Sequence, residues 1–433
     1  MTALAARIKR LLPRGRFARN VAVLAGGAAL GQAASILAAP ILTRLYAPAD
    51  FGVLNVYVSA LGILLAVGCL RYEYAIALPE ADELAVHVMV LAFTALTCVS
   101  ALFGVIIASY GASISLMLGV PEIRPYLWLL PISLMLGGAY QVMTLWGVRK
   151  QAYPVLARTR VQQGVGALLV QGALGWLHGG PLGLLLGDVF GRASGTLAIV
   201  RSVPPTRYAS GIRLALLLQV ARRYVRFPLV SAGSSLVNSA GQYYPPIVFA
   251  AMYGSEAAGW LFLAVKIFGL PLSLVGHSVG QVFLGHVAQR VTSDPRGVLR
   301  LHASLVLRLL LLGSVPAGVL MLFGPDLFAL VFGSAWREAG MYARLLALTF
   351  LFQLMAAPLS TLFDLTEEHA LGLIWDFVRI VLVLIPLYAA SALGLPARSA
   401  VAGYAVATVV CYALLIAFSR LALKRKARSV GHA

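Results

Sequence analysis

The chain has 433 residues, of which 60% are hydrophobic and only 11% are charged. Its mean hydropathy of +0.88 excludes a soluble enzyme and indicates an integral membrane protein. The formal net charge is +19, but in so apolar a chain the basic residues act as topological signals, and we expect no nucleic-acid partner.

The first predicted element is an apolar run of 22 residues, 21–42, which follows six basic residues in the first 20 positions. The apolar part of a secretory signal peptide has about 7 to 15 residues. The longer run therefore predicts an uncleaved first membrane span, with the N-terminus in the cytoplasm.

Eleven further apolar segments follow, and about 20 apolar residues are enough to cross the hydrocarbon core of a bilayer. The sequence therefore predicts an all-α integral membrane protein with about 12 transmembrane helices. The predicted spans are 21–42, 51–70, 84–110, 126–148, 161–177, 181–200, 227–253, 257–289, 301–323, 342–363, 370–390 and 397–419.

Basic residues give the orientation, because cytoplasmic loops are enriched in Lys and Arg. With the N-terminus inside, 26 of the 34 basic residues fall in loops or termini assigned to the cytoplasm, and 5 fall in outer loops. We therefore predict that both termini are cytoplasmic.

The longest connection, 201–226, divides the chain into two six-helix lobes, 1–200 and 227–433. Its second half mixes an apolar run with several arginines, which is typical of a helix lying on the cytoplasmic membrane surface. A solvated linker explains the same composition.

The two lobes resemble repeats of each other. Residues 46–52 (YAPADFG) and 253–259 (YGSEAAG) share a Tyr and a Gly at the same spacing, 207 residues apart. Six spans return the chain to its starting side, so such repeats keep the same orientation in the membrane. The pattern favours two parallel lobes that enclose a central cavity and rock about it.

The predicted eighth span, 257–289, contains one fixed charge, Lys266. At about 1.5 Å per residue the lysine lies roughly 14 Å along the helix, near mid-depth, where an ammonium costs on the order of 3 kcal/mol or more. Ser273, His277 and Gln281 follow at spacings of seven, four and four residues, so they share its helix face. These four residues predict a polar cavity.

Polar or small residues also form stripes on other predicted spans. The candidate cavity residues on the seventh and second spans are Ser231, Asn238, Gln242, Asn55 and Ser59. Such stripes either line a cavity or pack helices together. For Gly27 and Gly31 of the first span, which have the GxxxG spacing, we favour packing.

Two pairs of opposite charges lie within predicted spans. Asp188 and Arg192 are four residues apart, and Asp376 and Arg379 are three apart, so each pair can form an ion pair on one helix face. The pairs are either structural or take part in coupling to protons or sodium ions.

Two further arginines lie near span ends. Arg44 is at the outer end of the first span, and Arg71 is at the cytoplasmic end of the second. Long basic side chains at such positions either snorkel to the membrane surface or act as gates.

The sequence gives little support to catalysis. Residues 276–280 (GHSVG) match the G-x-S-x-G pattern of hydrolases, but that motif needs a strand-turn-helix context, and this match lies inside a predicted span. The three cysteines lack metal-ligand spacing, and no metalloprotease or nucleotide-binding motif is present. We therefore predict no enzyme activity, no cofactor and no metal site.

Three stretches resemble one family of membrane proteins. Residues 42–52 (LTRLYAPADFG) and 70–79 (LRYEYAIALP) are similar to the first two helices of polysaccharide flippases of the O-antigen type, the Wzx-like branch of the MATE-related MOP exporter superfamily. Residues 264–273 (AVKIFGLPLS) look like that family's eighth helix, where a basic residue often precedes Leu-Pro-Leu-Ser. Lys266 keeps the charge of the arginine found there as often, but not its planar fork.

The resemblance implies a flippase that moves an undecaprenyl-diphosphate-linked oligosaccharide from the cytoplasmic to the periplasmic face of the bacterial inner membrane, for surface polysaccharide or lipopolysaccharide biosynthesis. The implied partners are this lipid-linked sugar, membrane lipids, a proton or sodium ion as coupling ion, and the polysaccharide polymerase machinery. In this role Lys266 holds the diphosphate, and the other cavity residues hydrogen-bond sugar or water. Arg44 or Arg71 completes the anionic site.

Three rival functions make different demands on the chain. A multidrug exporter of the same superfamily needs an acidic or aromatic site for cationic drugs, which Lys266 disfavours. A membrane glycosyltransferase, polymerase or ligase carries its catalytic residues on a large outer loop, and every predicted outer loop is short. A purely structural scaffold does not need a mid-membrane lysine.

Overall fold

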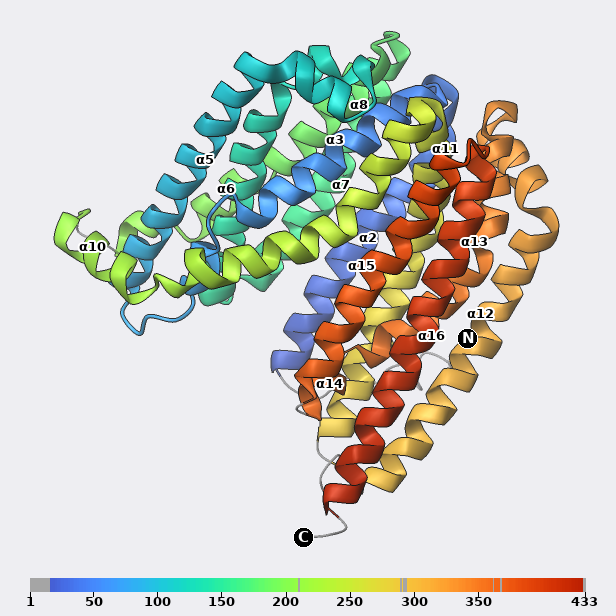
Figure 1. Cartoon of the computed structure of the whole chain (residues 1–433). Helices are drawn as coiled ribbons and strands as arrows, with labels where there is room; N and C mark the ends of the chain where they lie inside the picture. Colours follow the sequence, from blue (N-terminus) through green and yellow to red (C-terminus); the bar gives the residue numbers. More distant parts are fainter. Residues whose placement is uncertain are drawn as a thin grey trace, which may run out of the picture. The chain divides into compact units, whose positions relative to one another are not determined.

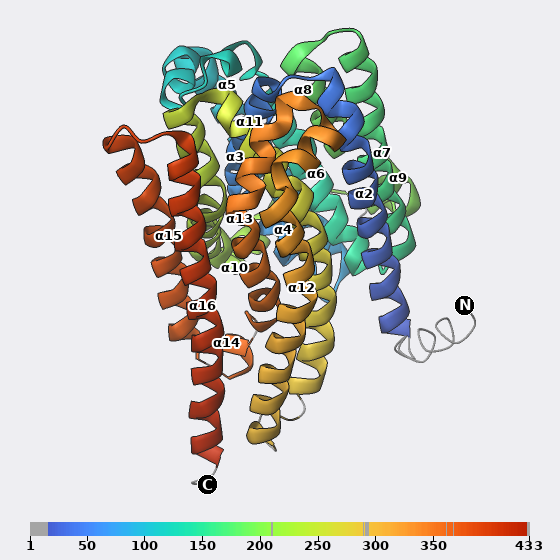
Figure 2. The same cartoon turned by 90° about the vertical axis from the view of Figure 1, so that its right-hand side faces the viewer.

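The computed structural model describes residues 16–208, 211–288, 290, 294–360, 362–366 and 368–430. These residues form helices and turns, and no β-strand occurs among them (Figures 1 and 2). The predicted all-α class is therefore confirmed.

Eleven long helices form most of the described chain. They are α2 (Arg16–Leu45), α3 (Pro48–Val67), α5 (Asp82–Met117), α6 (Leu129–Arg149), α7 (Tyr153–Trp176), α8 (Gly180–Ala193), α11 (Ala232–Ala288), α12 (Pro295–Phe332), α13 (Arg337–Ala356), α15 (His369–Ala392) and α16 (Ala397–Val430). Four shorter helices connect them, namely α4 (Tyr72–Ala75), α9 (Thr196–Ser202), α10 (Leu214–Arg223) and α14 (Leu362–Leu365). Each of the twelve predicted spans overlaps one or more of these helices. Helix α11 covers most of two predicted spans, 227–253 and 257–289, and α8 and α9 together cover the span 181–200.

Ten segments of the described chain are long and apolar enough to cross a membrane, which confirms a multi-pass membrane protein. The number differs from the twelve predicted spans for two reasons. The predicted seventh span and the first part of the eighth lie in one continuous segment, Phe227–Gly269. Helix α7 is not one of the ten, and it carries Arg158, Arg160 and three glutamines, which lower its apolar character.

Helix α11 is interrupted at Gly254. This residue has φ 82° and ψ 173° within an otherwise helical segment, a conformation that glycine adopts at no steric cost. The outer turn predicted between the seventh and eighth spans is therefore a break at one residue and not a loop. In the first repeat, the equivalent turn between α2 and α3 comprises Tyr46 and Ala47.

The internal repeat has a second structural signature. Helix α5 is followed by Gly119 with φ 65° and a 3₁₀ turn, Pro121–Tyr126. Helix α12 is followed by Gly333 with φ 104° and a 3₁₀ turn, Ser334–Trp336. Both turns lead into the next long helix, α6 or α13, so the repeat is confirmed at the level of local structure.

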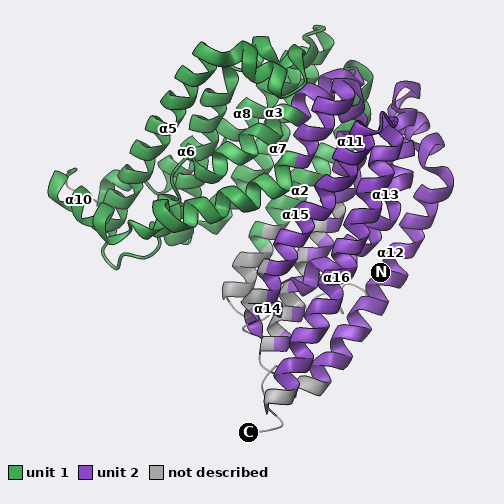
Figure 3. Ribbon diagram, viewed as in Figure 1, with its two compact units in different colours: residues 1–46, 56–244 green, residues 47–55, 245–433 purple. Residues whose placement is uncertain are grey.

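The chain forms two compact units (Figure 3). The first unit comprises Met1–Tyr46 and Val56–Tyr244, and the second comprises Ala47–Asn55 and Pro245–Ala433. The start of α3 thus belongs to the second unit, and the start of α11 belongs to the first. The predicted lobes 1–200 and 227–433, with a surface helix in the connection 201–226, stay a prediction, although α10 shows that this connection contains a helix.

Within the first unit, α2 lies alongside α7 (Figure 2). The contact runs through Gly27 and Gly31, where a Cβ would come within 2.6 Å of the Ala157 carbonyl oxygen and 2.9 Å of the Arg160 carbonyl oxygen. The predicted packing role of these glycines is confirmed, because only a residue without a side chain allows so close an approach.

Within the second unit, the first turns of α3 cross the second half of α11. A Cβ on Gly52 would overlap the carbonyl oxygen of Ser255, and a Cβ on Gly259 would overlap that of Pro48. The two contacts are related by the same 207-residue offset. The two repeats therefore contribute equivalent surfaces to this crossing.

Candidate functional site

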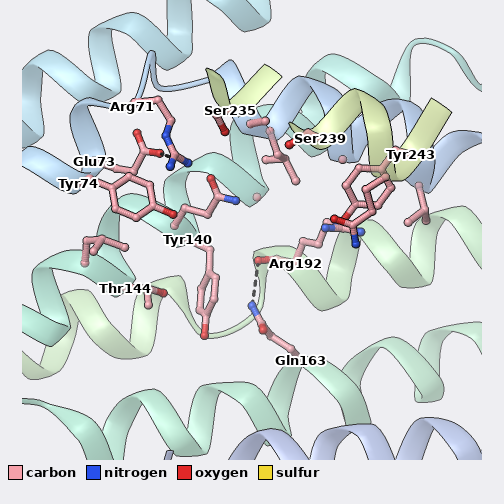
Figure 4. A pocket seen from close by; sticks show the side chains of 18 of the residues that line it. Arg71, Glu73, Tyr74, Tyr140, Thr144, Gln163, Arg192, Ser235, Ser239 and Tyr243 are labelled. Carbon is pink, nitrogen blue, oxygen red and sulfur yellow. Dashed lines mark hydrogen bonds and ion pairs between the residues drawn. The ribbon is translucent and has the colours of Figure 1, made fainter. Parts of the chain in front are cut away.

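A pocket of about 500 Å³ lies inside the first unit. Its wall is formed by α3, α4, α6, α7, α8 and the start of α11 (Figure 4). The polar lining residues are Arg71, Glu73, Tyr74, Tyr140, Gln141, Thr144, Arg160, Gln163, Arg192, Ser235, Ser239, Gln242 and Tyr243.

Arg71 reaches the pocket from a strained turn between α3 and α4. Leu70 and Arg71 both have left-handed φ, 49° and 65°, which costs a non-glycine residue about 1 kcal/mol or more. The Arg71 guanidinium lies 4.0 Å from the centroid of the Tyr74 ring, and one of its nitrogens is 3.9 Å from a carboxylate oxygen of Glu73 (Figure 4). The turn thus places a cation, an aromatic ring and a carboxylate at one end of the pocket.

Arg149, at the end of α6, holds the segment that follows α4. Its guanidinium donates to the carbonyl oxygens of Ile76 (3.3 Å), Pro79 (2.6 Å) and Glu80 (3.1 Å), and to the carboxylate of Asp82 (3.0 Å). A planar guanidinium with five N–H donors suits this fan of acceptors. One side chain therefore fixes the backbone between α4 and α5.

Helices α6 and α7 supply the middle of the pocket wall. Tyr140 and Thr144 are four residues apart on α6 and share one face. The Arg160 guanidinium of α7 lies 5.5 Å from the centroid of the Tyr140 ring, within the range of a cation–π contact. Gln163, also on α7, donates from its amide to the carbonyl oxygen of Arg192 (3.5 Å, Figure 4).

Arg192 of α8 lies in a part of the pocket away from Arg71 (Figure 4). Its guanidinium donates twice to the carboxylate of Asp188, at 2.6 and 3.2 Å. This bidentate pair restrains the guanidinium and offsets its charge. The predicted ion pair is confirmed, whereas a role of the pair in ion coupling stays a prediction.

The start of α11 contributes Ser235, Ser239, Gln242 and Tyr243 to the wall. Ser239 is four residues after Ser235, and Gln242 and Tyr243 are three and four residues after Ser239, so all four lie on the same side of the helix. A Cβ on Gly62 of α3 would lie 2.7 Å from the Tyr243 ring, so α3 and the start of α11 approach closely within the first unit.

The pocket lining contains three guanidinium groups and one carboxylate, so its net charge is positive. Burial raises the pKa of the Glu73 carboxyl, while a backbone hydrogen bond and the charge of Arg71 oppose this shift. Such a pocket can hold an anionic group beside a hydroxyl-bearing one. Across the described residues, no group of three or more His, Cys, Asp or Glu side chains could hold a metal ion.

Three residues predicted from the sequence line this pocket, namely Arg71, Arg192 and Gln242. Two residues predicted on the same helix as Gln242 do not line it. Ser231 is the last residue of the π-helical turn Phe227–Ser231, which precedes α11. The side chain of Asn238 is exposed on the surface and lies outside the pocket lining.

The predicted polar residues of α3 are buried in packing. Asn55 and Ser59 have exposures of 5% and 3%, and neither lines the pocket. The Asn55 amide donates to the carbonyl oxygen of Ala258 within the second unit (3.3 Å). These positions therefore fit the packing alternative for polar stripes.

Lys266 lies in the second half of α11, in the second unit, and does not line the pocket. Its side chain is half-buried, with Nζ 5.6 Å from the centroid of the Phe262 ring. The side chains of Ser273, His277 and Gln281 lie outside the part of the chain whose side chains the structure describes. A cavity built by these four residues stays a prediction.

The remaining predicted charges lie elsewhere. Arg44 is exposed in the last turn of α2. Asp376 and Arg379 form the predicted ion pair on α15, with a nitrogen–oxygen distance of 3.4 Å, and the Arg379 guanidinium lies 4.8 Å from the centroid of the Trp375 ring. A gating role for Arg44 and a coupling role for the pair stay predictions.

The pocket residues of α6 and α7 are not predicted from the sequence. The predicted fifth span begins at residue 161, which leaves Arg160 in a loop, whereas α7 begins at Tyr153. Pro154, at the second position of α7, is a typical helix-start signal and places Arg160 inside the helix. On α6, the i, i+4 pair of Tyr140 and Thr144 is the corresponding signal.

The residues that line the pocket all lie within a longer segment that matches a known protein family. Residues 41–341 match the family described as "Polysaccharide biosynthesis protein". The chain belongs to this family. The resemblance stated from the sequence is therefore confirmed at the family level.

One curated relative of this family member is the succinoglycan biosynthesis transport protein ExoT of Rhizobium meliloti (strain 1021). The two are 26% identical over 353 residues, which cover 79% of this chain and 68% of ExoT.

Solved structures of membrane transporters share the fold. The lipid II flippase MurJ in an inward closed conformation has a TM-score of 0.70 at 11% identity, with 92% of this chain and 87% of that one covered. An inward-facing multidrug resistance MATE family transporter of the MOP superfamily has a TM-score of 0.61 at 13% identity, with 93% and 96% covered. The family member therefore has the MOP-superfamily fold that the resemblance predicts.

Proposed function

We propose that this family member is a flippase that moves an undecaprenyl-diphosphate-linked oligosaccharide from the cytoplasmic to the periplasmic face of the bacterial inner membrane. The observation that carries the proposal is the pocket of the first unit, where Arg71, Arg160 and Arg192 stand among hydroxyl and amide groups. A lipid-linked sugar requires both kinds of group, because its diphosphate is anionic and its glycan is rich in hydroxyls.

The pocket addresses the physical barrier to such a movement. Polar groups without hydrogen-bond partners cost several kcal/mol each in hydrocarbon. A polar pocket between membrane helices supplies partners for the headgroup and lowers that cost. Alternating exposure of the pocket to the two faces then moves the headgroup, while the lipid tail stays in the bilayer.

Further parts of the proposal come from the sequence. Both termini are cytoplasmic, and Lys266 adds a cation for the diphosphate. A proton or a sodium ion drives the exchange, and the polysaccharide polymerase machinery receives the product.

A strain that lacks this gene tests the proposal. We expect surface polysaccharide to disappear and lipid-linked glycan to accumulate on the cytoplasmic leaflet, and a plasmid copy of the gene should reverse both effects. The purified protein in vesicles should move the same lipid-linked glycan between leaflets. Normal surface polysaccharide without the protein, together with inactive vesicles, would contradict the proposal.

The variant Lys266→Ala tests the predicted contribution of the second unit. At normal membrane abundance it should abolish export, whereas Lys266→Arg keeps the cation and should preserve export. Unchanged export by Lys266→Ala would remove this residue from the site and leave the pocket of the first unit as the headgroup site.

The rival reading, a multidrug exporter, is disfavoured by the charge of the pocket. Cationic drugs need carboxylates, and the pocket lining has three arginines and one glutamate. Cells that overproduce the protein should therefore extrude ethidium no faster than cells without it. Faster extrusion would favour the exporter.

A further inference from the structure

Three buried polar atoms of the pocket hydrogen-bond to no group in the described part of the chain. They are Nε of Arg71, Oε2 of Glu73 and Oγ1 of Thr144. In Figure 4, Arg71 and Glu73 lie next to each other, and Thr144 lies on the same side of the pocket, beyond Tyr74. A buried polar atom without a partner costs about 1 to 3 kcal/mol, so three of them in one pocket indicate a ligand that supplies the missing partners.

The neighbours of these atoms hold them in place. Only 3% of Glu73 is exposed, and the Arg71 guanidinium is fixed between Glu73 and the ring of Tyr74. The left-handed backbone of Leu70 and Arg71 stores strain in the same turn, a pattern found where a side chain is presented to a ligand. Arg149 anchors the segment that follows.

The chemistry of the three atoms selects the ligand. Nε of Arg71 donates, a carboxylate oxygen of Glu73 accepts, and the Thr144 hydroxyl does either. A phosphate would meet the Glu73 carboxylate, and a metal cation would meet the Arg71 guanidinium, so both are disfavoured. A sugar hydroxyl satisfies the set, because it accepts from one neighbour and donates to another.

We propose that Arg71, Glu73 and Thr144 form a subsite for the hydroxyls of a neutral sugar ring of the lipid-linked substrate. The inference rests on the proposed flippase function and deepens it. Arg160 and Arg192, the other cations of the lining, face the diphosphate. The pocket therefore binds both parts of the headgroup, the sugar and the diphosphate.

Two probes distinguish binding of the diphosphate from binding of the sugar. One is undecaprenyl diphosphate without sugar, and the other is the lipid-linked glycan extracted from cells that lack this gene. Both are titrated against the full chain in lipid nanodiscs, with thermophoresis as the readout. The wild type should bind the glycan-bearing probe more tightly than the bare carrier.

Thr144→Val is the sharpest variant, because the hydroxyl that it removes bonds to no described group of the protein and the fold should not be affected. Its affinity for the glycan-bearing probe should fall about five- to tenfold, the value of one hydrogen bond to a buried partner, while its affinity for the bare carrier stays the same. Glu73→Gln, which replaces an acceptor oxygen by an amide donor, should act in the same direction.

The matched control is Thr94→Val, whose hydroxyl bonds to the Val90 carbonyl on an exposed face of α5 (3.0 Å), and it should change neither affinity. Arg160→Gln should weaken both probes. Two outcomes would overturn the sugar subsite alone. In one, Thr144→Val and Glu73→Gln bind the glycan-bearing probe as tightly as the wild type does. In the other, these variants lose the same affinity for both probes. Failure of the wild type to bind either probe would overturn the flippase proposal as well.

Discussion

The two units of the molecule each contain a cavity, and the two cavities differ in chemistry. The pocket of the first unit, of about 500 Å³, has guanidinium, carboxylate, hydroxyl and amide groups in its wall. The cavity of the second unit, of about 720 Å³, lies among α11, α12 and α13, and its lining residues in the described part of the chain are apolar side chains and one glycine. The internal repeat therefore preserves the helices but not the lining.

Equivalent positions show where the difference arises. Leu65 and Leu272 are 207 residues apart, and they line the first and the second cavity respectively. The helices that follow the two 3₁₀ turns diverge, because α6 presents Tyr140 and Thr144 while α13 presents Phe350. The first unit is therefore suited to a polar headgroup, and the second cavity is suited to hydrocarbon packing.

The largest effect is expected when the ion pair of the first unit is broken. Arg192→Ala removes a pocket cation and leaves Asp188 without its partner, which should cost about 3 kcal/mol of unfolding free energy and abolish export. The matched variant Arg379→Ala breaks the ion pair with Asp376. The side chains of this pair line neither of the two cavities, and Asp376 is half exposed. This variant should cost about 1 kcal/mol or less and leave most export intact.

Surface polysaccharide, normalised to the amount of protein in the membrane, and thermal unfolding in nanodiscs distinguish the two variants. An equal loss of export in both would contradict the assignment of headgroup binding to the first unit.

The next effect concerns the segment that carries Arg71 and Glu73. Arg149→Ala removes hydrogen bonds to four backbone carbonyls, those of Ile76, Ala77, Pro79 and Glu80, and to Asp82, which should lower the unfolding free energy by about 2 kcal/mol. Export should fall as well, because α4 loses the contact that fixes its position. Arg124→Ala, in the exposed turn before α6, is the control and should change neither quantity.

How much of the molecule the sequence predicts depends on the range of each physical signal. The span helices are predicted because an apolar run is a local property. The ion pair of Asp188 and Arg192 and the packing role of Gly27 are predicted because i, i+4 spacing is local as well, whereas the partner helix of Gly27 is not predicted. The pocket is not predicted, because Arg71 and Thr144 come together only when distant helices pack.

The turn at Leu70 and Arg71 is invisible to the sequence for another reason. Positions with a left-handed backbone conformation are usually occupied by glycine, asparagine or aspartate. Residues 70 and 71 are a leucine and an arginine. The backbone that follows this turn accepts a hydrogen bond at Pro79 from Arg149 of α6, a contact between residues far apart in the sequence. Helix α7 extends beyond its apolar run to Tyr153, and the Arg160 backbone within this extension packs against Gly31.

A smaller effect is expected from the titration of the pocket carboxylate. Burial raises the folded-state pKa of Glu73 above the ordinary value of 4.5, so the folded protein holds this proton more tightly than the unfolded chain. The contribution of Glu73 to stability is then fully present below pH 4.5 and is lost as the pH rises through the folded-state pKa.

Glu73→Gln never ionises at this position. It should therefore unfold at a higher temperature than the wild type in alkaline buffer, and the difference should close as the pH falls towards 4.5. Thermal unfolding across this pH range measures the effect. A difference that is constant with pH would mean that the Glu73 pKa is the same in both states.

The smallest effect is expected in the apolar cavity of the second unit. The rings of Phe268 and Phe350 stack there with centroids 5.3 Å apart, and Phe350→Leu removes this contact at a cost of about 1 kcal/mol. Export should be unchanged, because the polar lining of the first unit is untouched. Thr144→Val should show the reverse, with weaker transport and an unchanged unfolding temperature, because its hydroxyl bonds to no described group. If the two variants fail to separate transport from stability in this way, the two cavities do not divide recognition and packing between them.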